Sequence, residues 1–205
     1  MIVIWICIIG FLSFCSGVGI LRFWLLKNQS KKNAEKSSRI MHFLFFFGLV
    51  LPSTISFFYP GITHLDRLIG FHPLPSKPFF LIIGFLLLIP ALYLLTVSNK
   101  LLRKIGRGSN AFLLTKKIVE NDIYKHTRNP MSLGYYLFSL SIGFISSSTF
   151  LTFGVLLGLI PAHIIFLKYF EELELNLRFG EPYREYKQNT PFLIPSFSAK
   201  KVMEY

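Results

Sequence analysis

The sequence has few charged residues, and this scarcity limits the class of protein that it can encode. Only 16% of the 205 residues are Asp, Glu, Lys or Arg, whereas a soluble globular domain carries about 25%. Hydrophobic residues make up 52% of the chain, and Phe alone occurs 23 times. Several apolar runs reach the length of about 20 residues that crosses roughly 30 Å of hydrocarbon. These features exclude a soluble domain and predict a polytopic membrane protein.

Cysteine is also scarce. Cys7 and Cys15 are the only two, and both lie in the first apolar run. Buried thiols behave as small hydrophobic groups, so the sequence predicts neither a disulfide framework nor a metal site. The same run has no basic residue before it and is longer than the apolar core of a signal peptide, which indicates a retained membrane span.

Acidic residues number ten against 22 Lys and Arg, which gives a formal net charge of +12. The basic residues lie in the connections between apolar runs and leave no continuous basic face, so no nucleic-acid partner is expected. The Gly-Arg-Gly at 106–108 is too short for a phosphate-binding loop. No repeat or low-complexity segment divides the chain, which indicates a single domain over 1–205.

Five apolar runs are predicted to cross the membrane as helices: 2–26, 41–60 (with a kink at Pro52), 79–97, 131–148 and 149–170. Basic connections alternate with neutral ones. Five Lys and Arg stand against one Glu in 27–39, and eight stand against Glu120 and Asp122 in 98–129, whereas 61–78 is nearly neutral.

This alternation predicts the topology. Cytoplasmic connections carry an excess of Lys and Arg, so both basic connections and the C-terminal tail are placed in the cytoplasm and the N-terminus outside. The predicted fold is an all-α membrane bundle of about five spans. Three spans lie in 1–97, and 98–205 holds a linker, a helical hairpin and an amphipathic cytoplasmic segment.

The segment after the fifth span begins with three acidic residues, Glu171, Glu172 and Glu174. Apolar and aromatic residues then recur every three or four positions, which predicts an amphipathic helix at the membrane surface. Gly180 and Pro182 predict that this helix stops and restarts. A carboxylate at the bilayer border needs a partner. Arg128 in a structural ion pair is one candidate, and a cationic ligand is the other.

Two stretches carry a family resemblance: IVENDIYKHTRNPMSLG (118–134) and EELELNLRFGEPYREYKQNTPFLIP (171–195). Their internal spacing resembles that of the membrane methyltransferases that comprise the isoprenylcysteine carboxyl methyltransferases and the phospholipid methyltransferases. The resemblance covers about residues 100–197. It implies methyl transfer from S-adenosylmethionine to a lipid or lipid-like acceptor at the cytosolic face of a membrane.

Carried over position by position, the resemblance also implies a site in which Glu171 binds the cofactor. A carboxylate at this border can favour the positively charged sulfonium, and the cofactor carboxylate could be accepted by Arg128 or by backbone N–H groups at the start of the fourth span. Arg128 and Glu171 are the two predicted catalytic residues. A helix that begins at Pro130 suits an anion. The implied cofactor-binding residues are Lys116, Lys117, Ile118, Val119, Tyr124, Asn129, Pro130, Met131, Ser132 and Glu171; no metal is implied.

The chain departs from the family pattern at four positions. Asn129 stands where His is most frequent, Ser132 replaces a Tyr, and Asp122 replaces a Gly before Tyr124. Leu167 replaces the Arg with which isoprenylcysteine enzymes meet the substrate carboxylate, so a prenylcysteine substrate is not favoured.

Two other functions remain open at this stage. Membrane sterol-type reductases share a related C-terminal layout and use NADPH, although the Glu-Glu and Phe-Gly pairs of this chain favour methyl transfer. A non-catalytic membrane protein on the same scaffold is the second alternative. His163, inside the fifth predicted span, is expected to be hydrogen-bonded within the bundle rather than to bind a metal.

Overall fold

The computed structural model describes residues 2–51, 54, 62–108 and 114–196, and all regular structure in that part of the chain is helical. The predicted all-α fold class is therefore confirmed. Residues 149–179 run as one helix with two π-helical stretches. The elements are α1 (Ile2–Lys27), α2 (Lys31–Phe45), η1 (Phe46–Val50), α4 (Ile62–Ile69), α5 (Lys77–Lys104), η3 (Asp122–Lys125), α6 (Pro130–Ile145), α7 (Thr149–Phe153), η4 (Gly154–Leu159), α8 (Ile160–Ile165), η5 (Phe166–Glu171), α9 (Glu172–Phe179) and α10 (Glu181–Asn189).

In the part of the chain that the structure describes, three helical stretches are long and apolar enough to cross a membrane: Ile4–Lys27, Lys77–Lys104 and Thr149–Phe179. The first covers most of the predicted span 2–26, and the other two contain the predicted spans 79–97 and 149–170 and extend beyond their predicted C-terminal ends. Helix α6 covers most of the fourth predicted span but is shorter, with 16 residues. The second predicted span begins in α2 and η1, but Pro52 and most of 52–61 lie outside the described residues. The span count of five therefore stays a prediction.

The basic connection predicted at 27–39 is mostly helical, because α2 begins at Lys31. The hydroxyl of Ser30 accepts a hydrogen bond from the backbone N–H of Asn33 at 3.1 Å and so caps this helix. Small or apolar residues recur at helical spacing and are buried, namely Ala34, Ser37, Ser38 and Met41. This buried stripe packs against α1 and α9, whereas the basic residues lie on the exposed side.

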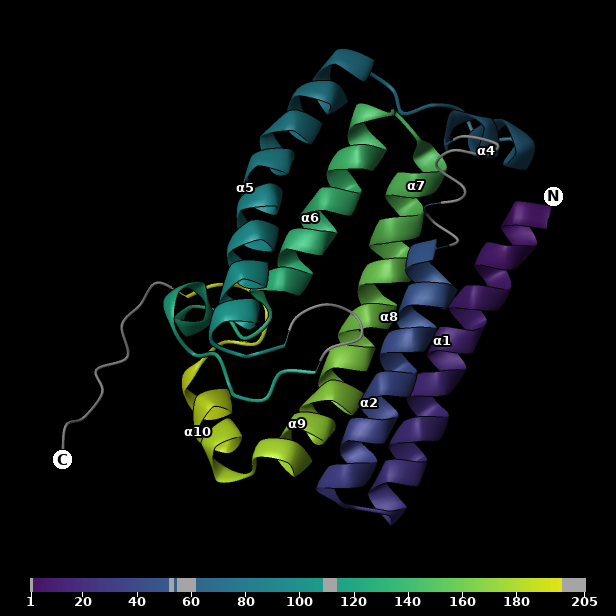
Figure 1. Cartoon of the computed structure of the whole chain (residues 1–205). Coiled ribbons are helices and arrows are strands. Elements are labelled where there is room, and N and C mark those ends of the chain that lie inside the picture. Colours follow the sequence, from purple (N-terminus) through teal and green to yellow (C-terminus); the bar gives the residue numbers. More distant parts are fainter. Residues whose placement is uncertain (1, 52–53, 55–61, 109–113, 197–205) are drawn as a thin grey trace.

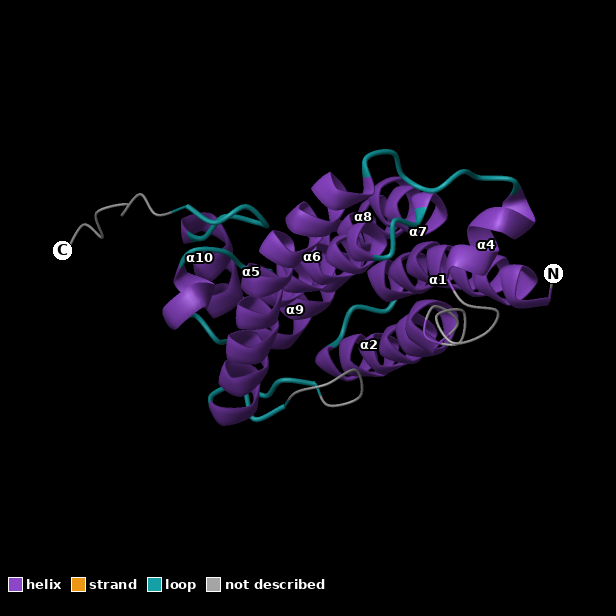
Figure 2. Ribbon diagram, turned by 90° about the horizontal axis from the view of Figure 1, so that it is seen from above, coloured by secondary structure: helices purple, strands orange, loops and turns teal. Residues whose placement is uncertain are grey.

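The helices form a row in the order α5, α6, α7 to α9, α2 and α1 (Figure 1). The view from above shows α5 and α6 at one side and α1 and α2 at the other (Figure 2). The largest buried cluster joins α1, α2, α8 and η5, with Phe14, Leu25, Met41, Phe166 and Phe170 at its centre. Helices α9 and α10 and the start of α6 gather at the end of the row opposite the start of α1 (Figure 1).

Helices α1 and η1 touch through two glycines. A Cβ on Gly10 would lie 2.1 Å from the carbonyl oxygen of Gly48, which is backbone and cannot move aside. Small residues allow membrane helices to approach this closely. Gly19, on the same helix α1, has open space where its Cβ would be.

Gly10→Ala is therefore expected to destabilise the protein by about 1–3 kcal/mol, the usual effect of overpacking. Gly19→Ala is expected to be neutral or slightly stabilising, because Ala favours helix by up to about 1 kcal/mol over Gly. Thermal unfolding in detergent measures both. Equal melting temperatures for the two variants would contradict the close packing of α1 on η1.

Candidate functional site

The two sequence motifs converge through a set of backbone hydrogen bonds. Residues 126–129 lie beside 190–196: the N–H of Arg128 donates to the carbonyl of Pro191 at 2.8 Å, and the N–H of Ser196 donates to the carbonyl of His126 at 3.0 Å. The Thr127 hydroxyl donates to the carbonyl of Leu193 at 2.9 Å. These bonds hold the segment before α6 against the C-terminal segment.

Two further hydrogen bonds complete this junction. The side-chain amide of Asn129 donates to the carbonyl of Phe192 at 2.9 Å. The hydroxyl of Tyr186, on α10, donates to the carbonyl of Tyr124 at 2.8 Å. The side chain of Asn129 thus links the two segments. The family motif, in which this position is Asn or His, did not predict this structural role.

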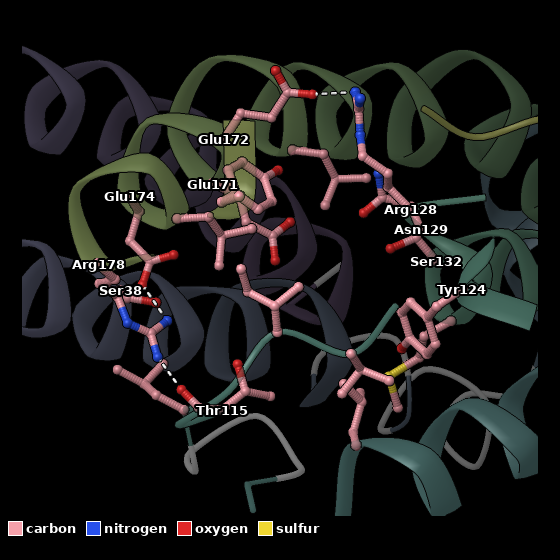
Figure 3. A pocket seen from close by; sticks show the side chains of 18 of the residues that line it. Ser38, Thr115, Tyr124, Arg128, Asn129, Ser132, Glu171, Glu172, Glu174 and Arg178 are labelled. Carbon is pink, nitrogen blue, oxygen red and sulfur yellow. Dashed lines mark hydrogen bonds and ion pairs between the residues drawn. The ribbon is translucent and has the colours of Figure 1, made fainter. Parts of the chain in front are cut away.

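A cavity of about 360 Å³ lies where these segments meet α2 and the helix 149–179 (Figure 3). Lys116 and Pro130 lie outside its lining. Lys116 donates its N–H to the carbonyl of Gly106 at 2.7 Å, and Pro130 is buried at the start of α6. The predicted residues that do line the cavity are Lys117, Ile118, Val119, Tyr124, Arg128, Asn129, Met131, Ser132 and Glu171.

Two of the three adjacent glutamates are paired. A carboxylate oxygen of Glu172 lies 2.7 Å from a guanidinium nitrogen of Arg128, and its other oxygen lies 2.5 Å from the Lys187 ammonium. Glu174 accepts from Arg178 at 2.6 Å, and both side chains are almost fully buried. Arg178 also donates to the carbonyl of Thr115, which fastens the cavity wall 114–119 to α9.

Glu171 differs from both neighbours. Its carboxylate makes no hydrogen bond or ion pair with any residue that the structure describes, and it points into the cavity between the two paired glutamates (Figure 3). The side chain is only half-buried because the cavity itself gives it access. A carboxylate held in an apolar border region without a partner favours a cation strongly. The site therefore fits a positively charged ligand group at Glu171.

Arg128 already has several protein partners. Besides Glu172, its guanidinium donates to the carbonyls of Lys187 and Thr190, the latter at 3.1 Å. Arg128 therefore joins the segment before α6 to the C-terminal segment by its side chain as well as its backbone. Direct contact between Arg128 and a cofactor carboxylate stays a prediction.

The start of α6 offers another group for an anion. Pro130 occupies the first turn, and no side chain caps the backbone N–H groups there, because the Asn129 side chain is bonded to Phe192 instead. Uncapped N–H groups at a helix start, together with the helix dipole, attract anions. Met131 and Ser132 of this first turn line the cavity.

The turn before Tyr124 keeps a glycine-like backbone despite the substitution at Asp122. Asp122 has φ +57°, in the left-handed region that favours glycine and that Asp tolerates better than most residues. The short helix Asp122–Lys125 forms there, and Tyr124 is buried against α5. Burial raises the pKa of the Tyr124 hydroxyl well above its usual range, and the nearby Glu171 carboxylate adds to the rise. Tyr124 is therefore a neutral wall of the cavity.

The structure adds lining residues that the sequence did not indicate. Helix α2 contributes Ser38, His42 and Phe45, which share one helix face at spacings of four and three. His163 also lines the cavity, and its Nδ1 lies 2.8 Å from the Tyr136 hydroxyl. That contact agrees with the hydrogen bond expected for His163 within the bundle. In the sequence, only their helical spacing marked the three α2 residues as cavity-lining. Every packed helix shows such spacing, so it could not identify them.

Comparisons with known proteins agree with this architecture. A family profile described as phospholipid methyltransferase matches residues 79–182, a stretch that begins in α5, contains the 128–132 turn and the three glutamates, and ends in α10. A comparison with curated proteins and one with solved structures each gave no match. The long apolar helices make the chain an integral membrane protein. Because the family match spans half of the chain and contains most of the cavity wall, the chain belongs to the phospholipid methyltransferase family.

Proposed function

We propose that the chain is an S-adenosylmethionine-dependent methyltransferase that acts on a lipid or lipid-like acceptor at the cytosolic face of a membrane. The observation that carries this proposal is the Glu171 carboxylate, which lines the cavity and has no partner among the residues described in the structure. S-adenosylmethionine bears a positive charge on its sulfur, and a half-buried carboxylate without a protein partner is complementary to it. The family match agrees with methyl transfer as the reaction.

The lining residues divide naturally among the parts of such a cofactor. Glu171 would face the sulfonium, and the uncapped start of α6 would face the amino-acid carboxylate. The apolar Ile118 and Val119 would cover the nucleoside, partly with their backbone. When bound, the cofactor supplies an activated methyl group. The protein contributes alignment, which can lower a barrier by about 7–11 kcal/mol, and exclusion of water from the charged centre.

The cytosolic assignment rests on where the basic residues lie. The C-terminal end of α5 carries Lys100, Arg103 and Lys104, and α2 begins with Lys31 and Lys32. Both helix ends lie at the end of the bundle that holds α9 and α10 (Figure 1). Positive residues are enriched on the cytoplasmic side, so we infer that the cavity opens there, with the N-terminus outside and the C-terminus in the cytoplasm.

Isothermal titration of the detergent-solubilised protein tests the proposal. We expect S-adenosylmethionine and its product S-adenosylhomocysteine to bind at one site per chain, and NADPH not to compete with either. Loss of binding for both adenosyl compounds would overturn the proposal. Binding of NADPH alone would assign the cavity to a reductase.

A further inference from the structure

The cavity has a second polar region, at its membrane end, that the cofactor assignment leaves unused. His42 of α2 and His163 of α8 both line the cavity there. His163 is buried, and its ring packs against the rings of Phe45 and Phe166, with centroid separations of 5.0 and 5.4 Å. Its Nδ1 is bonded to the Tyr136 hydroxyl. The imidazole is therefore held in one orientation by two aromatic rings and one hydrogen bond.

The second ring nitrogen of His163 remains open for a ligand. No hydrogen bond joins Nε2 to any described residue, although His163 contacts the cavity. When Nδ1–H donates to the Tyr136 oxygen, Nε2 carries the lone pair. His42 contributes another unused group, because its Nδ1 is buried without a hydrogen-bond partner in the described part of the chain. An imidazole of α2 and an imidazole of α8 thus both line the cavity.

His163 also has a fixed relation to Glu171. His163, Leu167 and Glu171 are spaced by four residues along one helix and all line the cavity. His163 and Glu171 are eight positions apart, which at about 1.5 Å per position corresponds to roughly 12 Å along the helix. This separation leaves room for a sulfonium group near Glu171 and for a nucleophilic atom between the sulfonium and His163. No Lys or Arg among the described lining residues lies on α2 or α8, so the membrane end offers no cation for an anionic acceptor.

Resting on the proposed function, we infer that His163 is a catalytic residue that binds the nucleophilic N–H or O–H of the acceptor and takes its proton. The acceptor nitrogen or oxygen forms the new bond to the methyl carbon. The carbon–sulfur bond of the sulfonium breaks and leaves its electron pair on sulfur. The proton released by the acceptor passes to Nε2 of His163, which becomes an imidazolium that keeps its Nδ1–H bond to Tyr136. Tyr136 is a positioning residue in this scheme.

Three probes with the same alkyl chain test the inference: dodecylamine, 4-dodecylphenol and dodecanoic acid, each in nanodiscs with labelled S-adenosylmethionine. We expect labelled product from the amine or the phenol at a rate at least tenfold above that from the acid. His163→Asn keeps an amide at the position of Nδ1 but has no group at Nε2. Its single-turnover rate is expected to fall about 10²-fold or more, the usual contribution of general acid–base catalysis.

Measuring cofactor binding separates a failure of the His163 inference from a failure of the proposed function. His163→Asn is expected to bind S-adenosylhomocysteine within twofold of the unchanged protein, and the matched control His72→Asn, at an exposed histidine outside the cavity lining, is expected to change neither rate nor binding. If His163→Asn does not fold, Tyr136→Phe tests the inference in its place. We expect its rate to fall about tenfold at unchanged cofactor affinity. An unchanged rate in the deciding variant, preference for the acid, or no product from any probe would overturn this inference. Absent cofactor binding in the unchanged protein would instead overturn the proposed function.

Discussion

Glu171→Gln is expected to weaken the binding of S-adenosylmethionine by about 10²-fold or more while affecting S-adenosylhomocysteine much less. The two ligands differ in the charge on sulfur, since the first is a sulfonium and the second a neutral thioether. Opposite charges about 4 Å apart at an effective dielectric constant near 20 interact by about 4 kcal/mol, and a factor of 10² corresponds to about 2.7 kcal/mol. Because Glu171 makes no hydrogen bond or ion pair with any described residue and lines the cavity, the substitution removes the charge that faces the ligand.

Titration calorimetry with both ligands measures this difference directly. A third ligand, the amine analogue sinefungin, carries a positive charge near the same place and is expected to follow S-adenosylmethionine. Glu181→Gln is the matched control: it removes a carboxylate from the same C-terminal segment, but Glu181 is exposed and pairs only with Arg184 among the described residues. Equal losses for the charged and neutral ligands would show that Glu171 does not face the sulfur.

Arg128→Ala is expected to destabilise the protein by about 2–3 kcal/mol and to abolish cofactor binding with it. Breaking a buried ion pair by removing one partner costs about 3–5 kcal/mol. The side chains of Arg128 and Glu172 are about 90% buried, but Lys187 remains beside Glu172 after the substitution and lowers the cost. The change also frees the carbonyls of Lys187 and Thr190, so the C-terminal segment would detach from the segment before α6.

Thermal unfolding in detergent measures this effect, for which we expect a fall of about 5–10 °C. Arg184→Ala is the matched control, since the Arg184–Glu181 pair is more than 60% exposed on both sides. Exposed ion pairs contribute about 0–1 kcal/mol. A melting temperature for Arg128→Ala that equals that of Arg184→Ala would contradict the structural role of the Arg128–Glu172 pair. Lost cofactor binding at an unchanged melting temperature would instead favour direct contact of Arg128 with the ligand.

Helical content and membrane residence followed from local properties of the sequence. Runs such as 79–97 are apolar over their whole length, and in hydrocarbon such a run satisfies its backbone only as a helix. The helix stop at Gly180 was equally local, because φ +64° at that position suits glycine. The boundaries were less predictable. Helix α2 begins at Lys31, inside a segment read as a basic connection, since burial of Ala34 and Met41 outweighs the polar composition.

Sequence alone also determined the two distant polar motifs and their residue types, because residue identity and spacing within a motif are properties of the sequence itself. The resemblance had singled out Glu171 among three neighbouring glutamates, but only the tertiary structure decided which of the three find partners among the described residues. Glu171, Glu172 and Glu174 are chemically identical, but successive helix positions point about 100° apart, so one reaches Arg128, one reaches Arg178 and one faces the cavity. The same holds for His42 and His163, which lie 121 positions apart in the chain. Long-range packing of α2 on the helix 149–179 places both at one cavity, and no local pattern encodes that contact.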